Sequence, residues 1–268
     1  MKFKDDKKSK ILIVIFLIIL IVMIFLYGII IQEHIARKRF SEKNMEVYQN
    51  NEEKVFKIEK IILCSSANAI DRSEEKNLQN LSIYQYTDIA IYIDNGDELS
   101  GKNTISKLYI DNISLEGEST GTKSLNYKNT LNFGLKEDIE EEKESNSNID
   151  FNIIYTNEQD KQTNYNEPSF FTDCSNPITL EYLNYNLKNN YKMEENNSVS
   201  FDGSILKKAG ISTDSIACKV KFRINIVNNQ NEKYSCPLNF KIPLNDIYKG
   251  TTMRAKTTDE DKYVFFRE

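Results

Sequence analysis

The most apolar stretch of the chain lies near its N-terminus. Residues 11–31 read ILIVIFLIILIVMIFLYGIII and contain no charged side chain. At about 1.5 Å per residue these positions make a helix of roughly 31 Å, which matches the ~30 Å hydrocarbon thickness of a bilayer. No small-residue cleavage pattern follows, since the chain continues Gln32-Glu33-His34. The pattern therefore predicts an uncleaved transmembrane helix, a signal anchor, in place of a removed signal peptide.

The next segment, residues 32–54, changes to a polar helical pattern. It lacks Pro and Gly and is rich in Glu, Lys, Arg and Gln, which favour helices. We expect a short helical stalk here. Its apolar residues do not keep a heptad over three repeats, so a coiled-coil dimer is left open.

From residue 55 onward the apolar period becomes two. Residues 216–226 carry apolar side chains at even positions, and residues 234–244 do the same after the turn 228–232. A hairpin centred on Gln230 pairs Ile224 with Cys236, and both apolar faces then point to one side of the sheet. Within the second strand, Pro237 and Pro243 share parity, which predicts a free sheet edge where their missing N–H groups lie.

Other segments show weaker strand patterns, and the only helix expected in this region is Ser204 to Ala209, which ends at Gly210. The pattern predicts an all-β fold for residues 55–268: an antiparallel β-sandwich, immunoglobulin-like in the broad sense. The chain has no Trp and so no Cys-Trp-Cys core. The further strands are expected at residues 55–64, 85–94, 104–115, 149–155, 178–187 and 263–266.

The formal net charge of -5 is unevenly distributed. Residues 1–10 hold five Lys against two Asp, whereas residues 61–268 hold 23 basic and 32 acidic side chains. An acidic domain is repelled by phosphate backbones, which excludes nucleic acid as the expected partner. Residues 136–147 (KEDIEEEKESNS) are expected to form an exposed acidic loop.

The single histidine is His34. Residues 35–268 therefore cannot form a Ser-His-Asp or Cys-His hydrolase site, an H-E-x-x-H metalloprotease site or a His-ligated zinc site. No catalytic, cofactor-binding or metal-binding residue is predicted, and the domain is expected not to be an enzyme.

The four cysteines, Cys64, Cys174, Cys218 and Cys236, have no C-x-x-C spacing, which argues against a zinc or redox centre. The hairpin register separates Cys218 from Cys236 by about 20 Å along the strands, too far for a disulfide. We expect buried, apolar cysteines. A bridge that involves Cys64 or Cys174 is left open.

Three further patterns resemble binding sites. Residues 117–124 (GESTGTKS) nearly match a phosphate-binding loop, but Thr122 stands where Gly is required, so a surface turn is expected. The Asp94–Asp97 segment is expected to be a turn and the acidic loop a solvated charge run, without calcium. Tyr84, Tyr86 and Tyr92 share one face of a strand, where cross-strand packing explains them without a ligand.

The orientation follows from flanking charge. Five lysines before the apolar helix compete with Arg37, Lys38, Arg39 and Lys43 after it. This weak bias, together with a short N-terminal tail, favours a cytoplasmic basic tail over residues 1–10 and an exported C-terminal domain. A cytoplasmic domain is the alternative.

These features predict a single-pass protein of the cytoplasmic membrane, held in the lipid bilayer by residues 11–31. Its extracytoplasmic sandwich is expected to contact a protein or cell-envelope partner. The alternatives are a membrane-tethered, carboxylate-dependent enzyme acting on an envelope glycan, or a pilus or secretion-complex subunit. The layout is similar to that of type IV pilins. Those proteins carry Gly just before the apolar helix and Glu five residues into it, whereas this chain has Lys10 and Ile15.

Overall fold

The chain divides into two compact units, Met1–Glu53 and Lys54–Glu268, which are described separately. The computed structural model describes most of the second unit and five positions of the first. The described residues are 55–71, 81–95, 104–129, 148–155, 167–189, 191, 200–257 and 263–268, together with Phe16, Leu20, Tyr27, Ile31 and Ile35.

The five described positions of the N-terminal unit all have helical backbone. Among the described residues there is no helix that is both long and apolar enough to cross a membrane. Apart from these five positions, the predicted transmembrane helix (11–31) and stalk (32–54) lie outside the described residues. The basic tail (1–10) and the acidic loop (136–147) lie wholly outside them.

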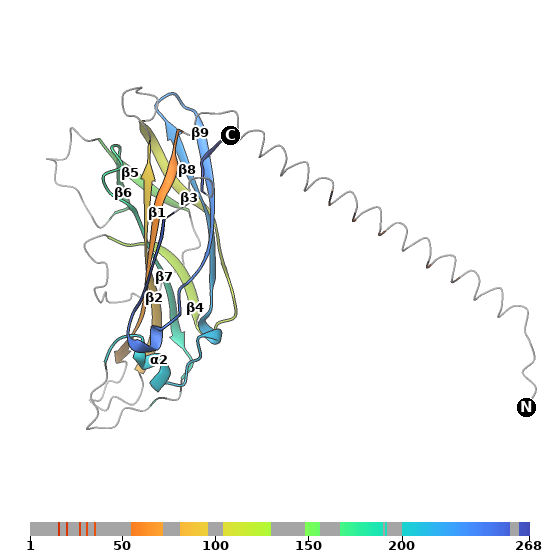
Figure 1. Ribbon diagram of the computed structural model, residues 1–268, viewed down its shortest axis with the longest axis vertical. Helices are drawn as coiled ribbons and strands as arrows, with labels where there is room; N and C mark the ends of the chain where they lie inside the picture. Colours follow the sequence, from red (N-terminus) through yellow and green to blue (C-terminus); the bar gives the residue numbers. More distant parts are fainter. Residues whose placement is uncertain are drawn as a thin grey trace, which may run out of the picture. The chain divides into compact units, whose positions relative to one another are not determined.

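Two sheets form the second unit (Figure 1). The five-stranded sheet has the order β10-β1-β2-β7-β4, and the six-stranded sheet has the order β11-β9-β8-β3-β5-β6. The all-β sandwich predicted from the sequence is confirmed. The strands are β1 (Lys57–Asp71), β2 (Leu81–Asp94), β3 (Ile105–Glu116), β4 (Thr122–Tyr127), β5 (Ile149–Ile154), β6 (Ser169–Phe171), β7 (Ile178–Leu187), β8 (Lys219–Asn228), β9 (Lys233–Lys241), β10 (Thr252–Thr257) and β11 (Phe266–Arg267).

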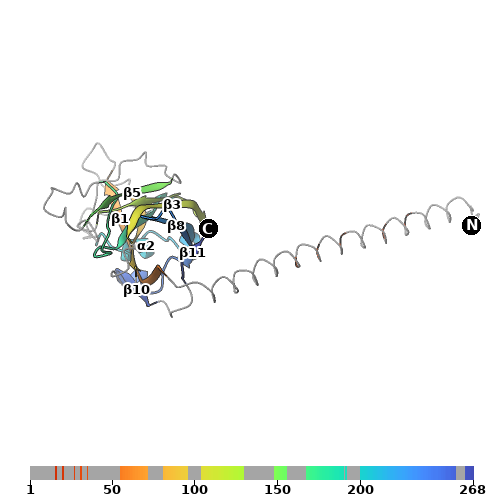
Figure 2. The ribbon, with the colours of Figure 1, turned by 90° about the horizontal axis from the view of Figure 1, so that it is seen from above.

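The main hydrophobic core lies between the two sheets, which Figure 2 shows from above. Ile61 and Ile89 of one sheet and Leu108 and Ile224 of the other contribute fully or almost fully buried side chains to it. A second, smaller cluster joins the far end of β1 and β2 to the short helix α2 (Ser204–Lys208). The apolar alternation of the strands is thus the physical cause of the two-layer packing.

The β8–β9 hairpin confirms the predicted register. Ile224 pairs with Cys236, and Phe222 and Ile226 pair with Leu238 and Tyr234. Even positions of both strands are buried. One boundary was wrong: β8 begins at Lys219, because Asp214–Ile216 forms a 3-10 turn whose Ile216 joins the smaller core cluster.

One pairing departs from the predicted antiparallel sandwich, because β5 and β6 run parallel. Parallel neighbours need a long crossover, and the connection from Tyr155 to Pro168 provides one. Strands β4, β6 and β10 were not predicted, since short or polar segments such as TMRAKT of β10 carry no clear alternation. The predicted strand at 263–266 is reduced to Phe266–Arg267, preceded by a single bridge from Val264 to Lys57.

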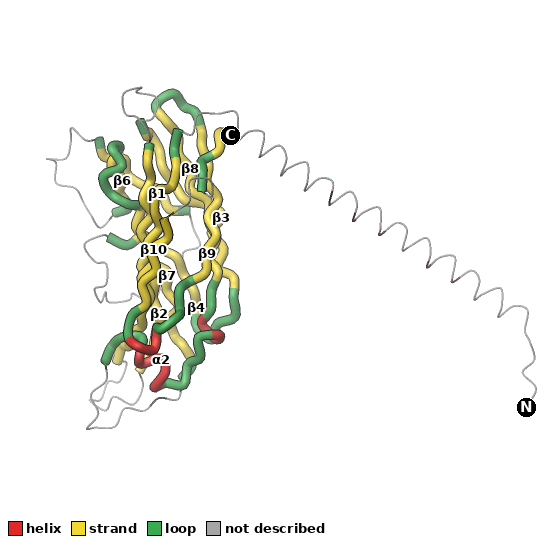
Figure 3. The backbone as a smooth tube through the Cα atoms, in the orientation of Figure 1, coloured by secondary structure: helices red, strands yellow, loops and turns green. Residues whose placement is uncertain are grey.

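The predicted helix end at Gly210 is confirmed. Gly210 has φ +70°, a left-handed conformation that favours glycine. The Gly210 N–H donates to the Lys207 carbonyl and the Ile211 N–H donates to the Leu206 carbonyl, which closes the helix. Figure 3 shows this helix and the short helical turns gathered at one end of the sandwich.

Candidate functional site

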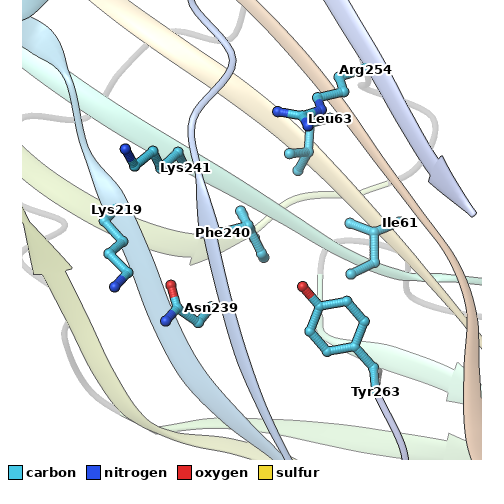
Figure 4. Close-up of a pocket in the computed structure, with 8 residues that line it drawn as sticks. All are labelled: Ile61, Leu63, Lys219, Asn239, Phe240, Lys241, Arg254 and Tyr263. Atoms are coloured by element: carbon cyan, nitrogen blue, oxygen red, sulfur yellow. The ribbon is translucent and has the colours of Figure 1, made fainter. Parts of the chain in front are cut away.

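A pocket of about 360 Å³ opens at the side of the sandwich, where the edges of the two sheets meet. Its walls come from β1 and β10 of one sheet, from β8 and β9 of the other, and from the segment before β11. This volume lies in the range of small-molecule sites. The described lining residues are Ile61, Leu63, Lys219, Asn239, Phe240, Lys241, Arg254 and Tyr263 (Figure 4).

Three cations border the pocket: Lys219, Lys241 and Arg254. Lys219 and Lys241 are direct partners in the β8–β9 ladder, an arrangement of like charges that destabilises a sheet. Glu116, the partner of Lys219 on β3, forms its ion pair with Lys221 instead. Within the described part of the chain none of the three cations forms an ion pair. The pocket is therefore a basic site on a domain that is acidic as a whole.

The base of the pocket is apolar and firmly packed. Ile61 and Leu63 are 2% and 4% exposed and belong to the main core. The Phe240 ring lies in the middle of the lining, and the Tyr263 hydroxyl is turned toward it (Figure 4). Phe240 is held by an edge-on contact with Phe222, with 6.0 Å between ring centroids. Such a site suits a ligand that joins an anionic group to an apolar one.

The outer edge of β9 borders the same pocket. Strand β11 pairs with β9 only at Tyr234 and Ser235, and no other described strand continues along that edge. The Lys233 carbonyl accepts a hydrogen bond from the Glu268 N–H and therefore points away from β8. Because backbone groups alternate along a strand, the N–H and C=O groups of the other odd-numbered residues of β9 point to the same outer side. Pro237 has this parity, which confirms the predicted free edge at that residue. Because Pro237 cannot donate, it opposes addition of another strand here.

A second cluster lies on the other face of the five-stranded sheet. Asp88 of β2 and Glu181 of β7 are direct ladder partners, and Cys64 of β1 stands opposite Asp88 on its other side. Lys128, which directly follows β4, donates from Nζ to Asp88 Oδ1 at 2.9 Å and to Glu181 Oε1 at 2.7 Å. The Lys128, Asp88 and Glu181 side chains are only 1%, 3% and 12% exposed.

The electrostatics of this cluster are set by burial and by opposite charges. Burial lowers the pKa of Lys128, but the carboxylates of Glu181 and Asp88 raise it by more, so the pKa lies above its ordinary value. The Lys128 ammonium also lies 5.4 Å from the centroid of the Tyr86 ring. Burial, and then the charge of Asp88, raises the pKa of the Cys64 thiol. The cluster is a charged, largely water-excluded centre.

The tyrosines singled out in the sequence lie on this same face, as their shared parity predicted. Tyr84 is 4% exposed, and its ring centroid is 6.3 Å from that of Tyr86. Burial raises the pKa of Tyr84 to about 12. Tyr92 is half-buried and pairs with Lys60 of β1. The Tyr84–Tyr86 contact lies within β2, so the expected cross-strand packing of these rings stays a prediction.

The segment that resembles a phosphate-binding loop opens a strand. Thr122 to Tyr127 form β4, whereas a phosphate loop needs a following helix. Lys123 donates from Nζ to the carbonyls of Leu115 and Gly117 at 3.0 and 2.7 Å. Residues 117–121 have irregular backbone, as the surface-turn interpretation expected, whereas residues 122–124 belong to β4.

The remaining predicted positions are dispersed. All four cysteines are free, with Cys218 and Cys236 buried. Asp94 forms an ion pair with Lys57 at 3.1 Å, while Gly96, Asp97 and the acidic loop 136–147 lie outside the described residues. Among the positions the structure describes, no group of three His, Cys, Asp or Glu residues is arranged to hold a metal.

The sequence pattern predicted neither the basic pocket nor the buried ionic cluster, although each leaves a signal in the sequence. The hairpin register already placed Lys219 opposite Lys241 on the polar face. Asp88 and Glu181 interrupt apolar strand segments, which marks them as charges that need a partner. Nothing local pointed to Lys128, because its partners lie on β2 and β7.

The architecture and its sites define a two-layer β-sandwich protein with a basic side pocket and a buried ionic cluster. No protein-family model, curated protein or solved structure matches the chain.

Proposed function

We propose that this chain is a single-pass membrane protein whose β-sandwich is displayed outside the cytoplasmic membrane and binds an acidic group of a protein or cell-envelope partner. Residues 11–31 act as the anchor, and the basic tail stays in the cytoplasm. The sandwich acts by binding and not by catalysis. The observation that carries the proposal is the basic pocket between β9 and β10.

The anchor rests on the uncharged apolar sequence and on exposure. Phe16 and Tyr27 have helical backbone and are 66% and 67% exposed. Large apolar side chains that stay exposed on a helix mark a surface made for lipid or for another protein. An uncharged run of this length favours lipid.

The binding role rests on charge and shape. Two lysines placed opposite each other weaken the β8–β9 ladder, and a bound anion relieves their repulsion. Arg254 lines the same pocket from the other sheet, and its guanidinium can form a two-pronged contact with a carboxylate or phosphate. The apolar base adds contact area beside the charge.

The enzyme alternative has a distinct requirement. Glycan hydrolysis needs two carboxyl groups about 5–9.5 Å apart in one cleft. The described lining of the pocket contains no carboxylate, and Asp88 and Glu181 are buried around Lys128. The pocket thus favours binding. The enzyme and the pilus or secretion subunit stay predictions without an observation in their favour.

Crosslinking and pull-down of the full chain from native membranes test the proposal. The pocket variant carries Lys219→Gln, Lys241→Gln and Arg254→Gln. A charge-matched control carries Lys188→Gln, Lys207→Gln and Lys208→Gln, at three exposed lysines outside the pocket. We expect one partner to be captured by the wild type and the control but not by the pocket variant. Equal capture by all three proteins contradicts the role of the pocket.

Orientation needs a separate test. A protease added to intact cells from which the outer envelope layers have been removed should degrade the sandwich and spare the N-terminal tail. Protection of the sandwich until the membrane is broken contradicts the exported arrangement.

A further inference from the structure

The buried cluster brings an amine into direct contact with a carboxyl group. Lys128 Nζ lies 2.9 Å from Asp88 Oδ1 and 2.7 Å from Glu181 Oε1. Asp88 and Glu181 are fixed on neighbouring strands by their ladder pairing. The Lys128 backbone is fixed as well, because its N–H donates to the Thr179 carbonyl of β7 at 3.3 Å. Groups held in contact in this way react far faster than free groups.

The surroundings of the pair exclude water. The Lys128 and Asp88 side chains are 1% and 3% exposed, so water is kept from reversing a condensation. The carboxylates of Glu181 and Asp88 favour the charged form of Lys128 more than burial disfavours it, so the neutral forms arise only by proton transfer within the pair. A proton that moves from Lys128 to Asp88 along their hydrogen bond converts the ion pair into a neutral amine and a neutral carboxylic acid. That transfer leaves the net charge of the site unchanged and produces the two forms that can condense.

We propose that Lys128 and Asp88 condense to an intramolecular amide crosslink, with Glu181 as the catalytic proton carrier. The inference is independent of the function proposed for the basic pocket. The crosslink would join β2 to the end of β4 across the intervening strand β7. It would be a permanent staple on the sheet face opposite the main core.

The step balances without any added reactant. The Nζ lone pair attacks Asp88 Cγ, and an N–C bond forms. Glu181 accepts a proton from the attacking nitrogen and returns it to the departing hydroxyl group, as a general base and then a general acid. The C–O bond breaks and one water leaves. The amine and carboxylic acid become an amide, no atom is oxidised or reduced, and Glu181 is regenerated.

Burial selects Asp88 over Glu181 as the acyl group. The Asp88 side chain is 3% exposed and that of Glu181 is 12% exposed, so an amide at Asp88 is better shielded from water. Glu181 keeps more contact with solvent and remains the carrier. The Tyr86 ring, 5.4 Å from Nζ, covers the amine from another side.

The test is the mass of the full chain, purified in detergent and measured after denaturation. We expect the wild type to be lighter than its sequence by one water. A tryptic digest should contain a branched peptide that joins Lys128 to Asp88, because trypsin does not cleave after an acylated lysine. A folded wild type at its full sequence mass, or a branch that joins Lys128 to Glu181, overturns the proposal.

Variants separate the reaction from folding. Lys128→Arg keeps a cation but cannot form this amide, and we expect it to have its full sequence mass. Glu181→Gln keeps the nucleophile and the acyl group and should slow the loss of water. The matched control Lys123→Arg lies on β4 outside the cluster and should lose water as the wild type does. If the Lys128→Arg variant still loses one water, the assignment of Lys128 as the amine of the crosslink is wrong. This conclusion does not depend on whether the other variants fold.

Discussion

Asp88 and Glu181 stand directly opposite each other on β2 and β7, so two carboxylates face each other on a buried sheet surface. Before the proposed condensation, the ammonium of Lys128 binds both carboxylates and makes this arrangement tolerable. The β2–β7 ladder therefore depends on a residue that belongs to neither strand.

Replacing this ammonium should destabilise the fold. We expect Lys128→Met to lower the free energy of unfolding by about 3–5 kcal/mol, because it leaves buried carboxylates without their partner, and the loss of the proposed amide adds to this cost. Chemical denaturation measures the change. Adding Asp88→Asn and Glu181→Gln to the same chain should recover part of the loss. The control Lys107→Met, at an exposed lysine, should stay within about 0.5 kcal/mol. A loss no larger than the control contradicts the role of Lys128.

The Asp111–Arg223 pair predicts a pH dependence. Arg223 donates from Nε and Nη2 to the two carboxylate oxygens at 2.9 and 2.8 Å, and these hydrogen bonds lower the pKa of Asp111. Because the pKa of Asp111 is lower in the folded than in the unfolded protein, its ionised carboxylate stabilises the fold. This stabilisation is fully present above the unfolded pKa of about 3.9 and is lost as the pH falls through the folded pKa. We expect Asp111→Asn to cost about 1 kcal/mol at pH 7 and less near pH 3.

The check is the unfolding free energy of wild type and variant at both pH values. Asp246→Asn is the control, because its partner Lys249 is 79% exposed and Asn tolerates the positive φ of position 246. It should change little at either pH. A cost of Asp111→Asn that stays constant with pH contradicts the assignment.

The thiols should differ in reactivity. Burial raises the pKa of Cys236 to about 12, and the residue is 1% exposed. At pH 8 we expect no alkylation of Cys236 or of buried Cys218 in the native protein, while half-buried Cys174 reacts. In denaturant without reductant, four thiols should be counted with a chromogenic disulfide reagent. A smaller count reveals a disulfide and contradicts the free cysteines of the structure.

Two glycines should respond differently to alanine. A Cβ at Gly203 would lie 2.2 Å from the Ile247 carbonyl oxygen and 2.5 Å from that of Gly250. Gly203→Ala should therefore cost about 3 kcal/mol, since backbone atoms must move. At Gly210 nothing lies within 4 Å, and only the positive φ costs about 1 kcal/mol. Thermal and chemical unfolding compare the two variants. Equal losses contradict the close backbone contact at Gly203.

One substitution in the pocket should raise the stability of the fold and at the same time abolish binding of the partner. Lys241→Glu replaces a like-charge pair with Lys219 by an opposite-charge pair. We expect it to raise the unfolding free energy by about 0.2–1 kcal/mol while abolishing capture of the acidic partner. Unfolding measurements and pull-down are made on the same preparation. Lys233→Glu, on the same strand outside the pocket, is the control for capture. A variant that is more stable and still captures the partner contradicts the pocket's role.

The strand register could be predicted where the pattern was strong and the turn short. Apolar side chains alternate over residues 216–226 and again over residues 234–244, with a five-residue polar turn between them, so Ile224 and Cys236 could be paired from the sequence alone. The same reasoning failed at β10, whose exposed Met253 and Arg254 carry no burial signal. It also failed at β6, which has only three residues.

The sequence by itself determined the alternation of β8 and β9, the stop of α2 at Gly210 and the position of the long apolar segment. These depend on neighbours within a few residues, where backbone geometry links side-chain order to the face that is buried. Only the tertiary structure decided which strands lie side by side. Lys128 meets Asp88 and Glu181 across 40 and 53 residues of sequence, and Lys241 and Arg254, from different sheets, line one pocket. Such contacts follow from the stacking and order of whole strands, to which no local pattern is sensitive.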